Sequence, residues 1–172
     1  DAPVAIADIN LVKEDATVSG TVASNDSDPD TGASLTYSAA ATAGLIFNTD
    51  GTYIFDASDA AYQHLAAGAT QDVVVTYTVS DGTASSTATL TITVTGVNDA
   101  PTAVNDTTSA VLEGAAAPLT GTVASNDSDI DDAATRTYSI ATAVAGLTFN
   151  ADGSYSFDAS NAAYNSLKDG EA

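Results

Sequence analysis

Apolar and polar residues alternate with a period of two along much of this 172-residue chain. From 73 to 79 the odd positions are Val, Val, Tyr and Val, and from 88 to 94 the even positions are Ala, Leu, Ile and Val between Thr residues. This period is typical of antiparallel strands that bury one face and turn Thr outward on the other. The Ser80-Asp81-Gly82 turn signal between the two runs predicts that they form a hairpin.

Shorter apolar runs predict the remaining elements. Leu45–Phe47 and Tyr53–Phe55 flank Asp50-Gly51, which is a strong hairpin signal. Further strands are expected at 4–6, 18–23 and 35–37, and a helix of one or two turns at 58–65, closed by Gly68. Short strands separated by frequent turns predict an all-β, immunoglobulin-like antiparallel β-sandwich.

The pattern occurs twice. Asp1-Ala2-Pro3 recurs as Asp99-Ala100-Pro101, and the segment 50–58 recurs with few changes as 152–160. The domain prediction is a complete repeat at 1–98 and a second repeat at 99–172, without counterparts of the last two strands, 73–97. Those strands are expected from a continuation of this chain or from another chain, and we favour the continuation. The opening at Asp1 suggests an excised fragment.

Each repeat contains one acidic loop in which carboxylates stand at every second position. In an extended loop such residues point to one side, as calcium ligands do, whereas a solvated turn is the alternative. The loop is not an EF-hand, because Thr31 and Tyr37 stand where Gly and Glu are needed. The candidate metal ligands are Asn25, Asp26, Asp28 and Asp30 in the first copy and Asn126, Asp127, Asp129 and Asp131 in the second.

Composition strengthens the case for a cation. The formal net charge is −20, from 23 acidic and three basic residues, and 20 of the acids are Asp gathered between apolar runs. Such a charge argues against nucleic acid and against direct insertion into a membrane, and no apolar run is long enough to span one. The chain has no Cys, so a metal ion is the expected substitute for disulfides in an extracellular protein.

Strand directions sort the loops onto two ends of each repeat. The acidic loop and Asp81 fall at the N-terminal end, and Glu14 falls at the other end. In tandem, the linker 96–101 then lies beside the acidic loop of the second copy, and together they could supply the six to eight oxygens that calcium needs. We therefore expect better occupancy at 127–131 than at 26–30. Glu14 and Asp81 are further candidate ligands, each with a solvated turn as the alternative.

Several motifs resemble a known class of repeat. The segments 50–56, 61–68, 75–82 and 89–101 are similar to the VCBS repeats of giant bacterial surface proteins and to the cadherin-like modules of RTX-type adhesins, although the RTX nonapeptide is absent. The resemblance implies a secreted, calcium-rigidified extender of the bacterial cell surface that serves attachment or biofilm formation. It also implies that Asn98 and Asp99 are interdomain ligands above the pair Asp127 and Asp129, and that neighbouring repeats are the partners.

Rival functions have weaker support. We expect no enzyme, because the single His64 has no catalytic or zinc partners and a carboxylate-based glycosidase site would need aromatic platforms that this Trp-free chain lacks. One alternative is a self-assembling filament or surface-layer subunit that uses strand donation. The other is a glycan- or ice-binding module that uses the row of Thr residues at 87–95.

Overall fold

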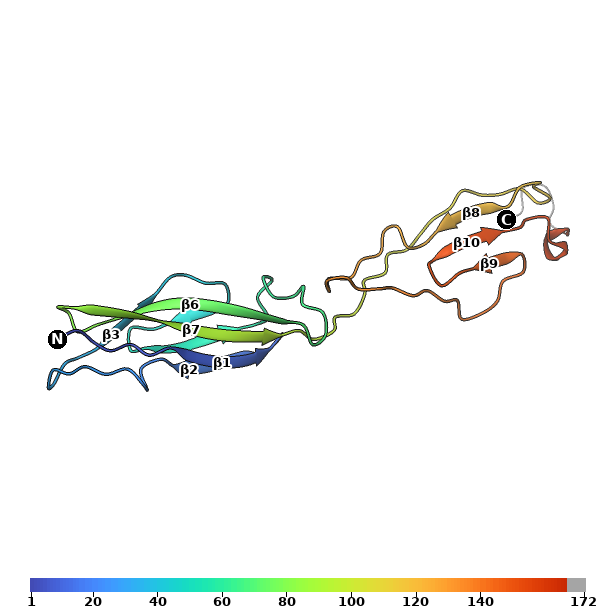
Figure 1. The fold of residues 1–172 in the computed structure, drawn as a ribbon. Coiled ribbons are helices and arrows are strands. Elements are labelled where there is room, and N and C mark those ends of the chain that lie inside the picture. The colour runs from blue at the N-terminus through green and yellow to red at the C-terminus, as the bar shows by residue number, and fades with distance from the viewer. Residues whose placement is uncertain (167–172) are drawn as a thin grey trace. The chain divides into compact units, whose positions relative to one another are not determined.

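The computed structural model describes residues 1–166, and its chain divides into two compact units (Figure 1). Unit 1 comprises Asp1–Asp99 with Ile130–Ala133. Unit 2 comprises Ala100–Asp129 and the described residues from Ala134 onward. The tip of the second acidic loop therefore packs with unit 1, whereas the rest of that loop belongs to unit 2.

Unit 1 is a sandwich of two sheets, as the alternating pattern predicts. One sheet has four strands in the order β1-β7-β6-β3, and the other has three in the order β2-β5-β4. The bounds are β1 Asp8–Lys13, β2 Thr17–Thr21, β3 Thr36–Ala39, β4 Leu45–Phe47, β5 Thr52–Asp56, β6 Thr70–Ser80 and β7 Ser85–Thr95. Both expected hairpins form, with Asp50-Gly51 joining β4 to β5 and Asp81-Gly82 joining β6 to β7.

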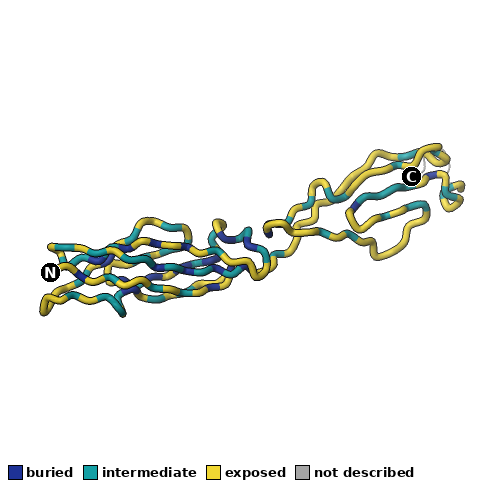
Figure 2. The backbone as a smooth tube through the Cα atoms, viewed as in Figure 1, coloured by how far each residue is buried: buried dark blue, intermediate teal, exposed yellow. Residues whose placement is uncertain are grey.

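The β6–β7 hairpin is the longest element of the sheet, and it supplies much of the core. Its two strands pair over their whole length, from Thr70↔Thr95 to Ser80↔Ser85. Val75, Tyr77, Leu90 and Ile92 are at most 2% exposed, because they face the opposite sheet. They pack with Phe55 of β5 in one continuous apolar cluster. Figure 2 shows this burial as the dark segments along unit 1.

The first strand differs from the prediction in place and in direction. The run at 4–6 makes only an isolated bridge between Val4 and Ser27, and the strand itself is Asp8–Lys13. It pairs with β7 in parallel, which corrects the expectation of a purely antiparallel sandwich. Its place is fixed by the register against β7, which buries Val12 and leaves Ile9 exposed.

The predicted helix at 58–65 is wrong in type. This segment is a series of turns in which the Tyr62 amide donates to Asp59 O (3.0 Å) and the Leu65 amide donates to Tyr62 O (3.2 Å). Such bonds span three residues instead of four, which suits a tight connection. Tyr62 and Leu65 are nevertheless buried, as their spacing predicts. The matching segment of unit 2 contains a short 3-10 helix at Ala162–Tyr164.

Unit 2 contains one sheet among its described residues. The strands are β8 Leu119–Thr122, β9 Leu147–Phe149 and β10 Ser154–Phe157, in the order β8-β10-β9. This order repeats β2-β5-β4 of unit 1. The segments that correspond to β1 and β3 form no strand in unit 2. Most of this unit is half-buried or exposed in Figure 2.

Candidate metal centre

Three carboxylates meet at the N-terminal end of unit 1. Asp28 and Asp30 come from the acidic loop, and Asp81 comes from the β6–β7 turn. One oxygen from each lies within 4.8 Å of the other two. Within the loop, the Asp30 amide donates to Asp28 Oδ1 (2.7 Å), so the backbone turns between two carboxylates that point the same way. Residues more than 50 positions apart in the sequence are thus brought into one acidic group.

Asp81 is held by the turn that it begins. Its Oδ1 accepts the amide hydrogens of Thr83 and Ala84, both at 2.6 Å. These bonds, with the Ala84 amide contributing most, lower the pKa of the Asp81 carboxyl below its ordinary value. The group is therefore ionised at neutral pH, and its Oδ2 makes none of these turn contacts. The backbone nitrogen of Asp1 contacts Asp30 Oδ2.

Asn25 and Asp26 extend this group inward. Asp26 Oδ1 accepts the Ile6 amide (2.7 Å), and Asn25 Nδ2 donates to Ile6 O (3.3 Å), which ties the loop to the entering chain. The opposite oxygens, Asn25 Oδ1, Asp26 Oδ2 and Asp28 Oδ2, are buried and have no hydrogen-bond partner. Buried oxygens without donors are costly unless a cation takes the place of water. An all-oxygen, mainly anionic donor set suits calcium.

Tyr77 links this end to the core, and sequence reasoning did not identify it as part of the site. Its hydroxyl lies 2.8 Å from Ile6 O, 3.1 Å from Asp8 Oδ2 and 3.2 Å from Asp26 Oδ1. Burial raises the pKa of the Asp8 carboxyl and, as the largest cause, that of the Tyr77 hydroxyl. The available signal was that an inward-facing Tyr needs a partner for its hydroxyl.

A second acidic set lies at the other end of unit 1. Glu14 is only 2% exposed; its Oε2 accepts the Val97 amide (2.8 Å), and its Oε1 is buried without a hydrogen-bond partner. Asp131 is 8% exposed, and its Oδ2 accepts the Asp99 amide (3.1 Å). The Asp132 amide donates to His64 O (2.8 Å), which fixes the tip 130–133 to this unit.

The remaining predicted ligands are placed as follows. Asp127 Oδ1 accepts the Val104 amide (2.7 Å), which repeats the bond between Asp26 and Ile6. Asp127 and Asp129 are half-buried and Asn126 is exposed, all within unit 2, while Asn98 is exposed in unit 1. Among the described residues, Asp28, Asp30 and Asp81 are the one acidic group that lies this close together. The better occupancy expected at 127–131 stays a prediction.

Both halves of the chain match families of bacterial surface repeats. Residues 1–96 match the bacterial cadherin-like domain, and residues 98–169 match a bacterial Ig domain. The fold and the acidic ends thus define an all-β chain of cadherin-like and Ig-like modules. This chain belongs to the bacterial cadherin-like domain family, whose model covers more than half of it. Modules of these families are typically non-catalytic, extracellular and adhesive, and cadherin-like domains generally bind calcium.

Solved structures offer more distant likenesses. The protocadherin GammaB4 extracellular domain is 17% identical over 91% of this chain and 29% of its own, with a TM-score of 0.49. A nucleoside hydrolase-related hypothetical protein from Saccharophagus degradans, associated with carbohydrate metabolism, is 19% identical over 56% of this chain and 26% of its own, with a TM-score of 0.38. At these TM-scores the two likenesses support no conclusion, and this chain spans less than a third of either structure. No curated protein matches the sequence.

The residues that the structure describes include no helix with the length and apolar character needed to cross a membrane.

Proposed function

We propose that this chain is a calcium-stabilised extender segment of a large secreted bacterial surface protein that serves cell attachment or biofilm formation. The observation that carries the proposal is the group formed by Asp28, Asp30 and Asp81, together with the donor-free buried oxygens of Asn25 and Asp26 beside it. Its partners would be neighbouring repeats of the same polypeptide, joined end to end.

The proposed ion would join parts of unit 1 that are far apart in the sequence. Asp28 and Asp30 lie on a loop without regular strand structure, whereas Asp81 lies on the rigid β6–β7 hairpin. Without a cation, these like charges repel one another across less than 4.8 Å. A divalent cation would replace that repulsion with attraction, so that calcium would fix the loop to the sheet. A rigid loop at the end of a module is what an extended array requires.

Glu14 supports the same function at the opposite end. A buried Glu with a donor-free oxygen is rare unless the carboxylate is paired or binds a metal. Its Oε2 is anchored by the amide of Val97, in the segment that leads into the linker. A cation at Oε1 would therefore stiffen the exit from the module. Asp99 and Asp131, joined by a hydrogen bond within unit 1, are candidate ligands at this end.

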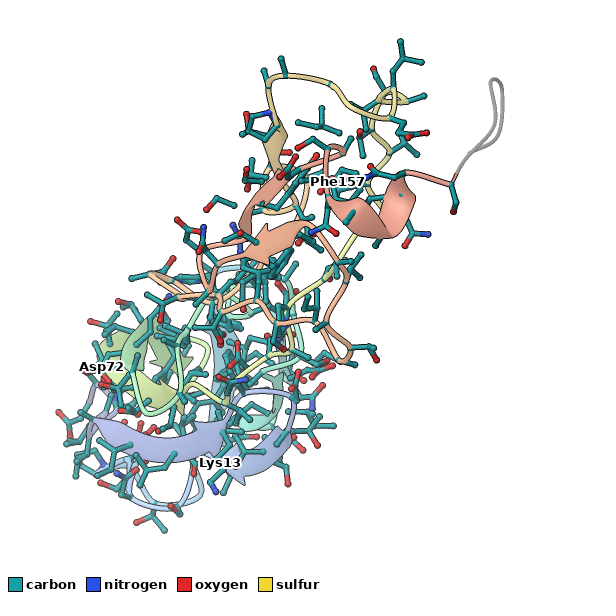
Figure 3. All side chains as sticks on the ribbon, turned by 90° about the vertical axis from the view of Figure 1, so that its right-hand side faces the viewer. Lys13, Asp72 and Phe157 are labelled. Atoms are coloured by element: carbon teal, nitrogen blue, oxygen red, sulfur yellow. The ribbon has the colours of Figure 1, made fainter. Side chains whose placement is uncertain are left out.

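Thermal unfolding with and without calcium tests the proposal. The midpoint Tm should rise with millimolar Ca²⁺ over its value in EGTA, because an ion that binds only the folded state stabilises it. Asp81→Asn should reduce the rise, since it removes charge from the acidic group. Asp72→Asn is the matched control, because Asp72 lies on the outer face of β6 and its carboxylate accepts the Thr93 hydroxyl (Figure 3).

If Tm is the same in Ca²⁺ and in EGTA, calcium does not stabilise the folded chain, and the calcium part of the proposal is wrong. A response that Asp81→Asn and Asp72→Asn reduce equally would mean that general charge screening, and not a bound ion, stabilises the chain. Repeating the scans with Mg²⁺ separates these cases further, because Mg²⁺ screens charge equally well but is a poor fit to large, flexible oxygen sites.

A further inference from the structure

The outer face of the four-stranded sheet of unit 1 carries three exposed aliphatic side chains. Ile9 and Leu11 on β1 are 85% and 71% exposed, and Val74 on β6 is 61% exposed, which makes them the most exposed large apolar residues of this unit. Ile9 and Val74 both pair with Thr91, so they lie in one row across β1, β7 and β6. Aliphatic groups gathered on one exposed face are typical of a surface that binds another macromolecule.

Packing within the module does not account for the two aliphatic residues on β1. Both point away from the core, whereas Val12 beside them is buried. The second repeat carries polar residues at the same positions. The isolated bridge at Val4 recurs at Thr102, and at the same spacing Thr107 and Ser109 are the counterparts. Exposed aliphatic groups on this segment are therefore a property of unit 1 and not of the repeat.

The same face is nearly free of the negative charge that marks the rest of the chain. Its outward positions include one base, Lys13, and one acid, Asp72, and most of the others are Thr or Ser. Lys13 is the one Lys or Arg in unit 1. With a net charge of −20, two copies of the chain repel each other wherever their acidic loops meet. Across this face two copies can approach without that local repulsion.

The two charges are placed so that two copies complement each other. Lys13 is on β1 and Asp72 is on β6, with β7 between these strands (Figure 3). A two-fold axis that lies in the interface and runs along β7 lays β1 of each copy over β6 of the other. Ile9 then lies over Val74 of the other copy. Lys13 stands one pleat step, about 6.6 Å along the strand, from Asp72 of the other copy, which its long flexible side chain can span.

The size of the face predicts a weak complex. Its strands contain 6, 11, 11 and 4 residues in the order β1, β7, β6 and β3. At the usual strand spacing and rise they cover about 500 Å², so two copies would bury about 1,000 Å² together. That area is at the lower limit for a specific interface. A pair of these faces should therefore bind reversibly and associate only at high concentration.

We propose that the outer face of the sheet β1-β7-β6-β3 is a self-association surface, on which a second copy of this chain docks through the same face. The copies are related by a two-fold axis along β7. Ile9 of each copy packs on Val74 of the other, and Lys13 and Asp72 form two equivalent ion pairs between the copies. The face includes none of the candidate metal ligands, so the dimer forms with or without calcium and stands apart from the calcium proposal.

Sedimentation equilibrium of the full chain tests the proposal, in salt of physiological strength so that long-range repulsion is screened. Between about 10 μM and about 1 mM, the weight-average mass should rise about 1.5-fold or more toward that of a dimer, in Ca²⁺ and in EGTA alike. Val74→Asp should hold the mass at the monomer value. Ile46→Asp is the matched control and should leave the rise unchanged, because Ile46 is equally exposed (60%) but lies on β4 of the other sheet.

Exchanging the charges tests the two-fold axis. Lys13→Asp leaves only acids on the face and Asp72→Lys leaves only bases, so each variant alone should stay a monomer. An equimolar mixture of the two variants should dimerise again, because each copy then supplies the charge that the other lacks. Circular dichroism verifies that every variant keeps its β-sheet, which is expected because all the substituted positions are exposed.

The proposal is overturned if the unsubstituted chain remains a monomer at about 1 mM in both buffers. It is equally overturned if Val74→Asp and Ile46→Asp change the mass to the same extent, because association would then use another surface. A mixture of the two charge variants that stays monomeric would also overturn it, since the ion pairs between copies would not form.

Discussion

Units 1 and 2 contain nearly the same three-stranded sheet, β2-β5-β4 and β8-β10-β9, but among the described residues a second sheet packs against it only in unit 1. Phe55 is fully buried in unit 1, whereas its counterpart Phe157 is half-buried in unit 2. Their ring contacts to Tyr62 and Tyr164 nevertheless agree within 0.1 Å, from the 5.2 and 5.3 Å separations. The geometry of the three-stranded sheet therefore depends on its own turns and pairs. Burial of its inner face depends on the β6–β7 hairpin.

The difference also separates two kinds of strand. β4 and β5 are joined by a tight turn, and their counterparts β9 and β10 form without the covering hairpin. β1 and β3 pair only with β7 and β6, and the corresponding segments of unit 2 form no strand. Local turn chemistry is thus sufficient for the first kind, whereas the second kind requires a partner from elsewhere in the chain.

The largest expected difference between the units concerns the aromatic core. Phe55→Ala should cost about 3–5 kcal/mol of the free energy of unfolding of unit 1, because it opens a cavity in a fully buried site. Phe157→Ala should cost unit 2 less than half as much, because that side chain is still partly in water. Denaturant titrations read by segment-resolved hydrogen exchange measure each unit separately. Equal losses in both units would contradict the comparison.

The sequence predicts the elements whose signals are local. Alternation at 73–79 identifies the buried face of β6, and Asp50-Gly51 identifies the β4–β5 hairpin. The parallel pairing of β1 with β7 joins residues about 80 positions apart, so no local pattern indicates it. The helical spacing of Tyr62 and Leu65 fits a series of tight turns equally well, and tertiary packing favours the turns over a helix.

The same division applies to the candidate site. The spacing of the acidic loop identifies Asp28 and Asp30, and the turn signal identifies Asp81, but the sequence does not show that all three converge. Glu14 and Glu113 look alike in the sequence, whereas Glu14 is buried and Glu113 is exposed. Their difference follows from packing at the end of the sandwich, where Glu14 meets the amide of Val97.

A somewhat smaller effect is expected where a glycine lies under a tyrosine ring in both units. A Cβ at Gly20 would lie 2.5 Å from Tyr53 Oη and 2.7 Å from its Cζ, and a Cβ at Gly121 would meet Tyr155 at the same two distances. Tyr53 is buried, and Asn10 Nδ2 donates to its hydroxyl (2.8 Å), so it cannot move away easily.

Gly20→Ala should therefore destabilise unit 1 by about 1–3 kcal/mol through overpacking. Gly121→Ala should cost unit 2 less, because half-buried Tyr155 can turn toward solvent. Urea titrations of the two variants, read by exchange in the segments 52–56 and 154–157, make the comparison. A larger loss for Gly121→Ala would show that unit 2 holds its tyrosine as tightly as unit 1 does.

The next effect compares the two glutamates, and its sign depends on calcium. In EGTA, Glu14→Gln should leave unit 1 as stable or make it more stable, because it removes a buried charge and keeps an acceptor for the Val97 amide. In Ca²⁺ it should lower stability by about 1–2 kcal/mol relative to the unsubstituted chain, as a ligand charge is lost. Calorimetric scans in both buffers measure the reversal, with Glu113→Gln as the exposed control. The same change in both buffers would leave Glu14 without a metal role.

The smallest effect should be identical in the two units, because it arises within a turn. Asp50 Oδ1 accepts the amide and hydroxyl hydrogens of Thr52 at 2.9 and 2.6 Å, and Asp152 Oδ1 accepts those of Ser154 at the same distances. The side-chain hydroxyl, followed by the backbone amide, lowers the pKa of each carboxyl below the ordinary value of 3.8. Protonation removes an acceptor that the turn uses. The stability gained from each turn is therefore complete above about pH 4 and is lost as the pH falls through the lowered pKa.

Carboxyl-carbon NMR titration of the two aspartates measures this directly. We expect both pKa values to lie below 3.8 and to agree closely, because neither turn needs the β6–β7 hairpin. If the pKa of Asp152 stayed at its ordinary value while that of Asp50 was lowered, then even this turn would depend on the covering strands, and the distinction between strands that form locally and strands that need a distant partner would fail.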